Sequence, residues 1–406
     1  MLTIFKEVCT PFYHNGKVHK PLIFLFILIN LLVFANAILH NPYQGYDAAD
    51  HINYIKAFAL KRAIPTCADT DMCYFPPLPY LLPAIILATG RINLWEAAKF
   101  AQIFNVFLSL GLTYYLIKIC DLIDPNKIIF KFSSLVMLGI LPVYYKSFSL
   151  IRGETYLPLL FVFIVYQVLS IYLVKGKPVA KLVLLGLAVG LSILARQWGL
   201  LVLPAIFLFA IYAIFKDHSN FRLSILMMGV CILIPVLVAG WYYFIMFQRL
   251  GSLTAWDRRP SNLSLNALPI DFYFGTGSGK LFTDPIRPSF SNQFPAIFYS
   301  DTWGDYSAYF LVYAKDKRTF LFLRFYHHNG VFLCSAHRID RLFVQQLKNN
   351  ALGRLLASLV LRAVFTFARF VEGLRKQRHH RADIVDPFHH IRHARRNRHL
   401  LVQFPV

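Results

Sequence analysis

The sequence is short of charged residues. Only 15% of its 406 residues are Asp, Glu, Lys or Arg, whereas a typical soluble domain has about 25%. Apolar residues make up 57% of the chain, and the mean hydropathy is +0.51. This scarcity of charge excludes a disordered protein, a coiled coil and an ordinary soluble enzyme, and it indicates a multi-pass membrane protein.

Acidic residues are the scarcer charged type: 20 Asp and Glu stand against 42 Lys and Arg, a net charge of +22. Half of this excess, +11, lies in residues 319–406, which hold 13 Arg, 2 Lys and 9 of the 14 His. We therefore separate this Arg- and His-rich tail from the rest. Residues 1–247 form the predicted transmembrane module, and residues 248–318 form a predicted outer region.

Nucleotide and metal chemistry have little support. The glycine-rich residues 274–280 lack the first Gly of a phosphate loop and are followed by Leu281 instead of Ser or Thr, so we expect no nucleotide site. Four of the six cysteines show no ligand spacing. Cys67 and Cys73 share one predicted outer loop with Asp69 and Asp71, and a disulfide, free thiols or a metal site remain open there.

Long apolar runs predict an all-α, polytopic membrane protein. A helix needs about 20 mainly apolar residues to cross a bilayer. Seven segments approach this length: 21–39, 97–119, 128–145, 155–174, 182–195, 199–215 and 223–247. The positive-inside rule puts the Lys-containing N-terminal segment in the cytoplasm, and the first span has no small-residue cleavage site, so we expect a retained anchor in a plasma or bacterial inner membrane.

This topology places a long first loop, residues 40–95, on the outer side. The loop contains two short helical segments, an amphipathic one at 48–60 and an apolar one at 78–88. The apolar segment is too short to span, so we expect an interfacial or re-entrant helix there. Successive spans place their connections on alternate sides of the membrane. The short connections near residues 146–154 and 196–198 therefore also face outward. Three outer loops therefore meet the same side of the membrane.

The first outer loop opens with ionisable residues. Asp47 and Asp50 are three apart, as are His51 and Tyr54, so each pair shares one face of a helix. Two interpretations compete. The acidic residues cap the start of the helix at 48–60, or Asp47 is a general base at the membrane surface.

The other two loops carry further charges. Arg152 and Glu154 form either a local ion pair or part of a site. Arg196 ends a long apolar run, where it either snorkels to the interface or grips a phosphate. Because the topology puts Asp47, Glu154 and Arg196 on one side of the membrane, their convergence favours the functional interpretation.

Four motifs in this order resemble a known family. They are Tyr-Asp-Ala-Ala-Asp-His at 46–51, Tyr-Phe-Pro-Pro-Leu-Pro-Tyr at 74–80, Leu-Ala-Arg-Gln-Trp-Gly-Leu at 194–200, and the stretch 291–305 ending Ser-Asp-Thr-Trp-Gly-Asp. The arrangement is similar to the polyprenyl-phosphate-sugar glycosyltransferases of the GT-C class (family 39-like), which include protein O-mannosyltransferases and aminoarabinose transferases.

The resemblance implies a GT-C-like helical bundle that moves a sugar from a polyprenyl phosphate to a hydroxyl group on protein, lipid or glycan. It assigns the catalytic carboxylate to Asp47. It also matches Glu154 and Arg196 with the acidic and basic residues of later outer loops. Ala48 and Phe75 depart from the Glu and Lys that family members often have at these positions.

These departures shift roles onto neighbouring residues. Asp50 stands in for the missing acid. The donor phosphate then relies on one or more cations: Arg196, Arg152 and Lys146. We expect supporting roles for three further residues: His51, Tyr54 and Glu154. The resemblance names no cofactor, and a divalent metal stays open.

Two other function classes compete with a transferase. A transporter or flippase for a lipid-linked or anionic substrate would place charges near the midplane, often in repeated halves. The sequence has no internal repeat, and its polar clusters fall in outer loops, which favours surface chemistry. A non-catalytic assembly partner in the membrane is the third alternative.

The tail, residues 319–406, does not continue the family pattern. Its apolar segment 352–371 contains Arg354, Arg362 and Arg369, each of which costs about 2.5–3.5 kcal/mol at the centre of a span. It is either a basic segment on anionic lipid or the product of a shifted reading frame, which we favour. A nucleic-acid arm has no supporting fold signal, so membrane lipid and the polyprenyl-linked sugar are the expected partners.

Overall fold

The computed structural model describes residues 10–14, 17–174, 178–251, 269–275 and 293–303. The chain divides into two units, Met1–Arg324 and Phe325–Val406, and every described residue belongs to the first. The Arg- and His-rich tail lies outside the described residues, as do most of the predicted outer region and residues 291, 292, 304 and 305 of the motif at 291–305. Predictions about those segments therefore stay predictions.

The described chain is almost entirely helical, apart from a hairpin of β1 (Tyr13–His14) and β2 (Lys17–Val18). Six helical segments are long and apolar enough to cross a membrane. They contain α2 (Lys20–Leu39), α5 (Leu94–Ile123), η2 (Gly153–Thr155) with α8 (Leu157–Leu173), α9 (Pro178–Ala195), η3 (Gln197–Leu201) with α10 (Val202–Lys216), and η4 (His218–Asn220) with α11 (Phe221–Leu250). The composition and these lengths are those of a multi-pass membrane protein.

The predicted span at 128–145 is not one straight helix. It consists of α6 (Ile128–Gly139) and α7 (Pro142–Phe148), which are bent by 69° at the break between them. Pro142 explains the break, because proline cannot donate a helical hydrogen bond and disfavours helical geometry in the residue before it. Counting the bent pair as one span gives seven candidate spans in the described part of the chain.

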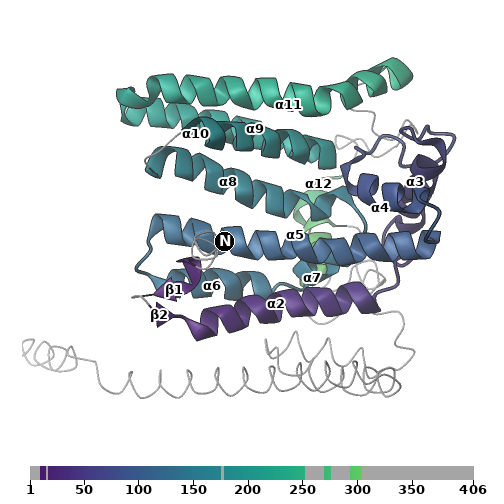
Figure 1. Cartoon of the computed structure of the whole chain (residues 1–406), viewed down its shortest axis with the longest axis horizontal. Coiled ribbons are helices and arrows are strands. Elements are labelled where there is room, and N and C mark those ends of the chain that lie inside the picture. The colour runs from purple at the N-terminus through teal and green to yellow at the C-terminus, as the bar shows by residue number, and fades with distance from the viewer. Residues whose placement is uncertain (1–9, 15–16, 175–177, 252–268, 276–292, 304–406) are drawn as a thin grey trace, which may run out of the picture. The chain divides into compact units, whose positions relative to one another are not determined.

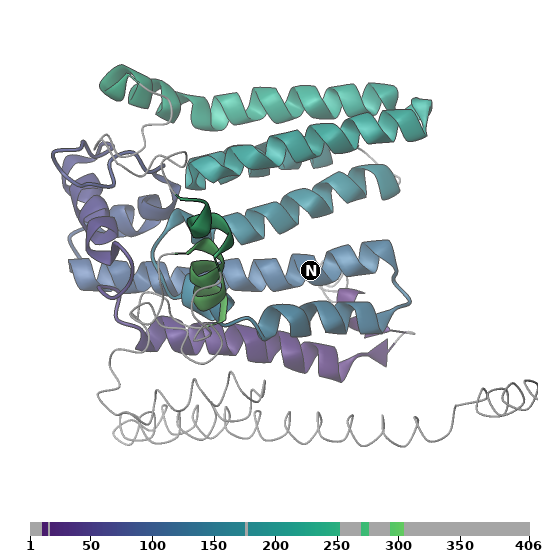
Figure 2. The same ribbon diagram turned by 180° about the vertical axis from the view of Figure 1, so that it is seen from behind.

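The long helices lie side by side, with α5 at the centre of one half of the bundle (Figures 1 and 2). Helix α5 packs against α2, α6 and α8, and α9 packs against α8 and α11. The second half has an apolar core that includes Leu185 and Val189 of α9 and Met227 of α11, all fully buried. Two short helices, α12 (Ile270–Phe274) and α13 (Phe294–Trp303), contact each other, and α13 contacts α7.

One buried polar group links three helices inside the bundle. We call it the interior polar cluster: Asn30 of α2, Ser109 and Thr113 of α5, and Tyr144 of α7. The Asn30 amide donates to Thr113 Oγ1 at 3.0 Å and accepts from the Ser109 hydroxyl at 2.7 Å. Because the Ser109 hydrogen is used in this way, the Tyr144 hydroxyl donates to Ser109 at 2.5 Å. Every member of the cluster is hydrogen-bonded, as burial requires.

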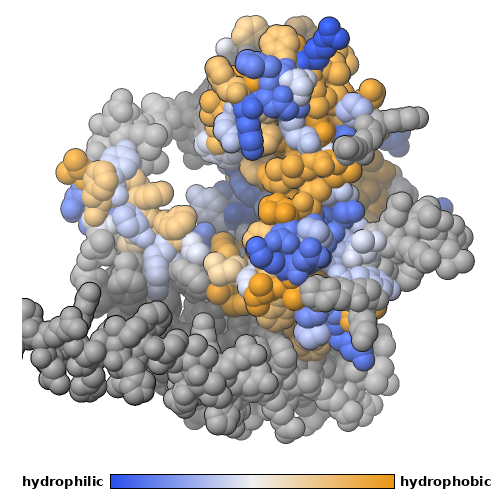
Figure 3. All heavy atoms as spheres, turned by 90° about the vertical axis from the view of Figure 1, so that its left-hand side faces the viewer, coloured by the Kyte–Doolittle hydropathy of each residue, from blue (hydrophilic) through white to orange (hydrophobic). Residues whose placement is uncertain are grey.

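The two ends of the bundle differ in structure. At one end lie the first loop and its helices, α3 (Ala48–Lys61) and α4 (Leu78–Ala88), which confirm the helices predicted at 48–60 and 78–88. We call this the loop end. The opposite end, seen in Figure 3, carries hydrophilic residues among apolar ones. Exposed Lys127, Lys216 and Arg222 lie at the connections from α5 to α6 and from α10 to α11. The positive-inside rule assigns that end to the cytoplasm, so the loop end is the predicted outer end.

Candidate functional site

Helix α5 anchors the start of the first loop. The Lys99 amine donates to the backbone oxygens of Ala37, Ile38 and His40 at 3.0, 3.1 and 2.5 Å. The last carbonyls of a helix have no partner within the helix and carry partial negative charge. Lys99 therefore fixes the C-terminal end of α2, immediately before the loop that carries Asp47.

The same helix anchors the second loop. The Gln102 amide donates to Ser149 O at 2.7 Å, and the Asn105 amide donates to Phe148 O and Leu150 O at 3.0 and 2.8 Å. These residues were not singled out from the sequence. Their spacing of three on an apolar helix is a signal that could have found them, since polar groups in a span usually have a specific partner.

Asp47 lies in a tight turn against the second loop. Gly45 has φ 146° and packs so closely on Leu150 that an added Cβ would lie 2.5 Å from its side chain. Asp47 occupies the N-cap position of α3 with φ 55°, in the left-handed region, and its carboxylate makes no cap hydrogen bond. Asp47 thus begins the helix and Asp50 lies in its first turn, as the capping interpretation expects, but the Asp47 side chain does not cap the helix by a hydrogen bond.

The second and third loops meet at Glu154 and Arg196. Arg196 Nη2 lies 2.8 Å from Glu154 Oε1. The backbones are close enough that a Cβ on Gly153 would lie 2.1 Å from Ala195 O, so only glycine fits there. A local Arg152–Glu154 pair is thus not formed. Arg152 instead donates from Nη2 to Tyr46 O at 3.3 Å, beside Asp47.

The ring of Phe75 packs against Arg196 and His51. The Arg196 guanidinium carbon lies 3.6 Å from the centroid of the Phe75 ring, and the His51 ring centroid lies 5.6 Å from it. A cation stacked on an aromatic face is attracted by the ring electrons. Only 16% of the Arg196 side chain is exposed, so this residue packs against its neighbours at the loop end. The sequence marked Phe75 only as a departure from the family pattern.

His51 is buried and neutral. Its Nδ1 lies 2.7 Å from the Tyr80 hydroxyl, and its ring stacks on that of Tyr80. Burial, reinforced by Arg152 and Arg196, lowers the pKa of His51 to about 3. Tyr54 shares the stack and donates its hydroxyl to Phe75 O at 3.1 Å. The predicted supporting residues His51 and Tyr54 thus lie in one aromatic stack with Tyr80.

The Asp47 carboxylate lies within electrostatic range of four other charged side chains. Burial raises the pKa of the Asp47 carboxyl, and Arg152 acts in the opposite direction. Asp50 raises the pKa further, while Arg196 lowers it and Glu154 raises it by smaller amounts. We call Asp47, His51, Arg152, Glu154 and Arg196 the loop-end site. The structure therefore brings together residues from all three predicted outer loops.

Several polar atoms of the loop-end site are buried without a partner. Within the described part of the chain, Arg152 Nε, Arg196 Nε and Glu154 Oε2 have no hydrogen bond. Leaving a buried donor or acceptor unpaired costs about 1–3 kcal/mol. Unpaired atoms of this kind mark a place where a ligand group would be stabilised.

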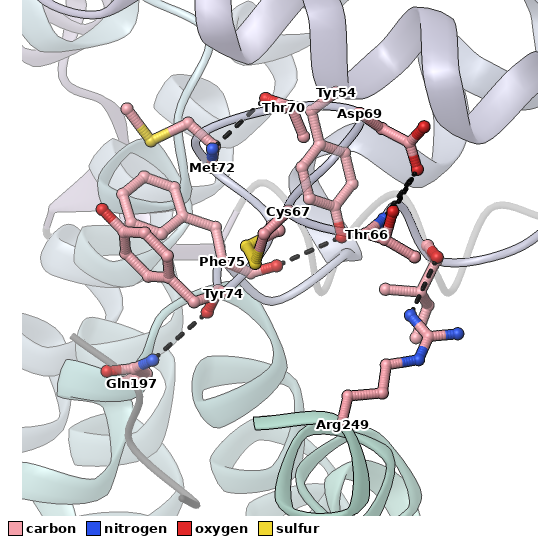
Figure 4. Close-up of a disulfide and its surroundings, with 12 residues drawn as sticks. Tyr54, Thr66, Cys67, Asp69, Thr70, Met72, Tyr74, Phe75, Gln197 and Arg249 are labelled. Atoms are coloured by element: carbon pink, nitrogen blue, oxygen red, sulfur yellow. Dashed lines mark hydrogen bonds between the residues drawn. A yellow bond between two sulfur atoms is a disulfide. The ribbon is translucent and has the colours of Figure 1, made fainter. Parts of the chain in front are cut away.

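A disulfide closes residues 67–73, two residues before Phe75 (Figure 4). Cys67 and Cys73 are bonded, with their Cα atoms 4.9 Å apart. The segment is docked at both sides, because Gln197 of the third loop donates to Tyr74 O at 3.2 Å and Thr70 donates to Asp50 O at 3.1 Å. The disulfide therefore restrains the backbone from which Phe75 projects.

Lys146 is not among the charges that act on Asp47. Its amine donates to the backbone oxygen of Asp301 in α13 at 2.5 Å and to its carboxylate at 3.2 Å. Among the described residues, no group of three or more His, Cys, Asp or Glu side chains is placed to hold a metal ion. Arg152 and Arg196 are thus the cations that the structure puts beside Asp47.

Comparisons with protein-family models, with curated proteins and with solved structures found no match to this chain. The structure and composition identify a multi-pass helical membrane protein. The GT-C resemblance rests on the four sequence motifs, and its consequences are taken up as a proposal.

Proposed function

We propose that this protein is an integral-membrane glycosyltransferase that moves a sugar from a polyprenyl phosphate to a hydroxyl acceptor at the outer membrane face. One observation carries the proposal: an Asp47 carboxylate with no hydrogen bond among the described residues lies beside two arginines whose Nε donors are also unpaired. A base next to an anion-binding pair is what transfer from a lipid phosphate requires.

In the proposed reaction, the acceptor oxygen forms a bond to the anomeric carbon while the bond from that carbon to the phosphate oxygen breaks. Asp47 takes the acceptor proton, and polyprenyl phosphate leaves with the bonding electrons. The phosphate changes from a diester with one negative charge to a monoester that carries additional charge. No nucleotide takes part.

Arg196 and Arg152 have different roles in the proposed reaction. Arg196 is held by Glu154 and stacked on Phe75, so its guanidinium is fixed in advance, which is the property that makes electrostatic stabilisation effective. Arg152 lies close to Asp47 and counters the rise in its pKa. It thereby keeps the base ionised. Asp50 acts only through its charge.

The outward orientation is part of the proposal. The Cys67–Cys73 disulfide belongs to the loop end, and disulfides persist in oxidising compartments outside the cytosol. A long polyprenyl tail in the bilayer would bring its phosphate to this interface, which gives a reason for the many apolar helices around a small polar site.

The test is a transfer assay on purified protein in liposomes with a panel of radiolabelled polyprenyl-phosphate sugars and membrane-extract acceptors. We expect sugar transfer by the wild-type protein, and a loss of about 10²- to 10⁴-fold in Asp47→Asn. The matched control is Asp71→Asn, an exposed carboxylate of the same loop, which should keep wild-type activity. Movement of intact donor across the liposome membrane without transfer would instead show a flippase.

A further inference from the structure

His51 has a hydrogen-bond arrangement that fixes where its proton lies. Tyr80 is fully buried, and within the described residues its hydroxyl has one partner, His51 Nδ1 at 2.7 Å. If Nδ1 carried the proton, the Tyr80 hydrogen would be buried without an acceptor, which is costly. Tyr80 therefore donates to Nδ1. The neutral ring then carries its proton on Nε2.

The second ring nitrogen is left available. Within the described part of the chain, His51 Nε2 has no hydrogen-bond partner. The ring is held on two sides, because it stacks on Tyr80 at 5.7 Å and lies 5.6 Å from the Phe75 centroid. A donor that is both unpaired and fixed in orientation is preorganised for a ligand.

The neighbours of this donor are cationic. Phe75 contacts both the His51 ring and the Arg196 guanidinium. Arg152 and Arg196 are the two charges that act on His51. Each arginine has a buried Nε hydrogen with no partner among the described residues. Three N–H donors without a partner among the described residues therefore come from α3 and from the second and third loops, and a tetrahedral anion has enough acceptor oxygens for all three.

We propose that His51 Nε2–H, Arg152 Nε–H and Arg196 Nε–H form one phosphate subsite, in which His51 is the neutral donor and Tyr80 is the positioning residue that keeps the proton on Nε2. This inference rests on the proposed function for the identity of the phosphate as a polyprenyl phosphate. The phosphate chemistry itself follows from the three donors. A neutral third donor binds the anion without adding a third positive charge next to Asp47.

The first experiment measures binding without chemistry. Wild-type protein in nanodiscs is titrated with polyprenyl phosphate that carries no sugar, and separately with inorganic phosphate. We expect His51→Leu to weaken phosphate binding about ten- to a hundredfold, as for loss of a hydrogen bond to a charged group. His51→Gln retains one amide donor and should recover part of the affinity. Tighter binding of polyprenyl phosphate than of inorganic phosphate would assign the subsite to a lipid-linked ligand; equal binding would assign it to the free ion.

The second experiment reads the proton position directly. In ¹⁵N-histidine-labelled protein, the signal that disappears in His51→Gln should show an unprotonated Nδ1 and a protonated Nε2. Tyr80→Phe should disturb this signal and weaken phosphate binding by less than His51→Leu does. Tyr144→Phe is the matched control, because it removes a buried hydroxyl of the interior polar cluster and should change neither readout.

Two results would overturn the inference: a proton on Nδ1 in the wild-type protein, or unchanged phosphate affinity in His51→Leu with an intact fold. These results are independent of the proposed reaction. If phosphate binds in a His51-dependent way while no donor sugar is transferred, the subsite stands and the transferase proposal fails. If sugar is transferred while His51→Leu raises neither the donor KM nor the phosphate Kd, the transferase stands and the subsite fails.

Discussion

The interior polar cluster and the loop-end site both take polar side chains out of water, but they leave them in different states. In the interior polar cluster each hydroxyl and amide has its partner within the bundle. In the loop-end site two guanidinium Nε atoms and one carboxylate oxygen are buried and unpaired among the described residues. Polar groups that are all hydrogen-bonded to one another hold helices together, whereas buried polar groups without a partner can be stabilised by a ligand. The comparison predicts that the two groups respond differently to substitution.

Among the substitutions that test this comparison, the largest effect is expected from Arg196→Gln. The change removes a fixed charge and leaves Glu154 without the partner that it has at 2.8 Å. We expect the donor KM to rise about 10- to 100-fold, measured in the transfer assay. Arg222→Gln, an exposed arginine at the opposite end of the bundle, is the matched control. An unchanged KM in Arg196→Gln would contradict the comparison, because the loop-end site would then bind the donor no better than the fully hydrogen-bonded interior polar cluster.

The next effect concerns the disulfide that restrains the Phe75 segment. Replacing both Cys67 and Cys73 by Ser should make this segment less stable by about 2 kcal/mol, the chain-entropy value for a short loop. The donor KM should rise with it, because Phe75 supports Arg196. Hydrogen exchange of residues 62–77 and the transfer assay measure the two effects. Reductant should reproduce them in the wild-type protein and leave the double Ser variant unchanged.

A smaller effect, of a different kind, is expected from Ser109→Ala. Ser109 bridges Asn30 and Tyr144 in the interior polar cluster, and a hydrogen bond between membrane helices contributes about 0.6–2 kcal/mol. The thermal midpoint in detergent should fall while the donor KM keeps its wild-type value. A change in KM at constant stability would mean that the interior polar cluster belongs to the site.

The smallest expected effect is a pair of opposite shifts in the pH profile. Asp47 must be ionised to act as a base, so activity falls as pH drops through its pKa, which burial raises above the ordinary value. Arg152 lowers this pKa and Asp50 raises it. Arg152→Gln should therefore move the acid limb of the kcat profile to higher pH, and Asp50→Asn should move it to lower pH. Each shift should be below about one pH unit, because partly exposed charges interact weakly; shifts in the same direction would contradict the arrangement.

Local patterns in the sequence predicted the helices well where hydropathy alone decides them. The apolar run at 78–88 coincides with α4, and the amphipathic run at 48–60 is within one residue of α3. The run at 128–145 corresponds to the bent pair of α6 and α7, and its bend was not predicted, because a hydropathy window does not register that Pro142 must begin a new helix. Apolar length predicts a span, but the backbone chemistry of one residue decides whether the span is straight.

The site was predictable only as far as topology carries. The alternation of connections between predicted spans was enough to expect Asp47, Glu154 and Arg196 at one end of the bundle. It did not predict that Glu154 pairs with Arg196 in place of Arg152, because that choice depends on the close approach of Gly153 to Ala195. The contact between His51 and Tyr80, 29 residues apart, is likewise set by tertiary packing that one sequence does not encode in any local pattern.

The anchoring by α5 has a consequence for how this molecule tolerates change. Lys99, Gln102 and Asn105 all bind main-chain oxygens of the loops, and every residue type supplies the same carbonyl. The attachment is therefore indifferent to the side chains that the loops carry. Side chains of the loops that do not pack against a neighbour can be exchanged without loosening these attachments, so the architecture and the proposed choice of ligand can be altered separately.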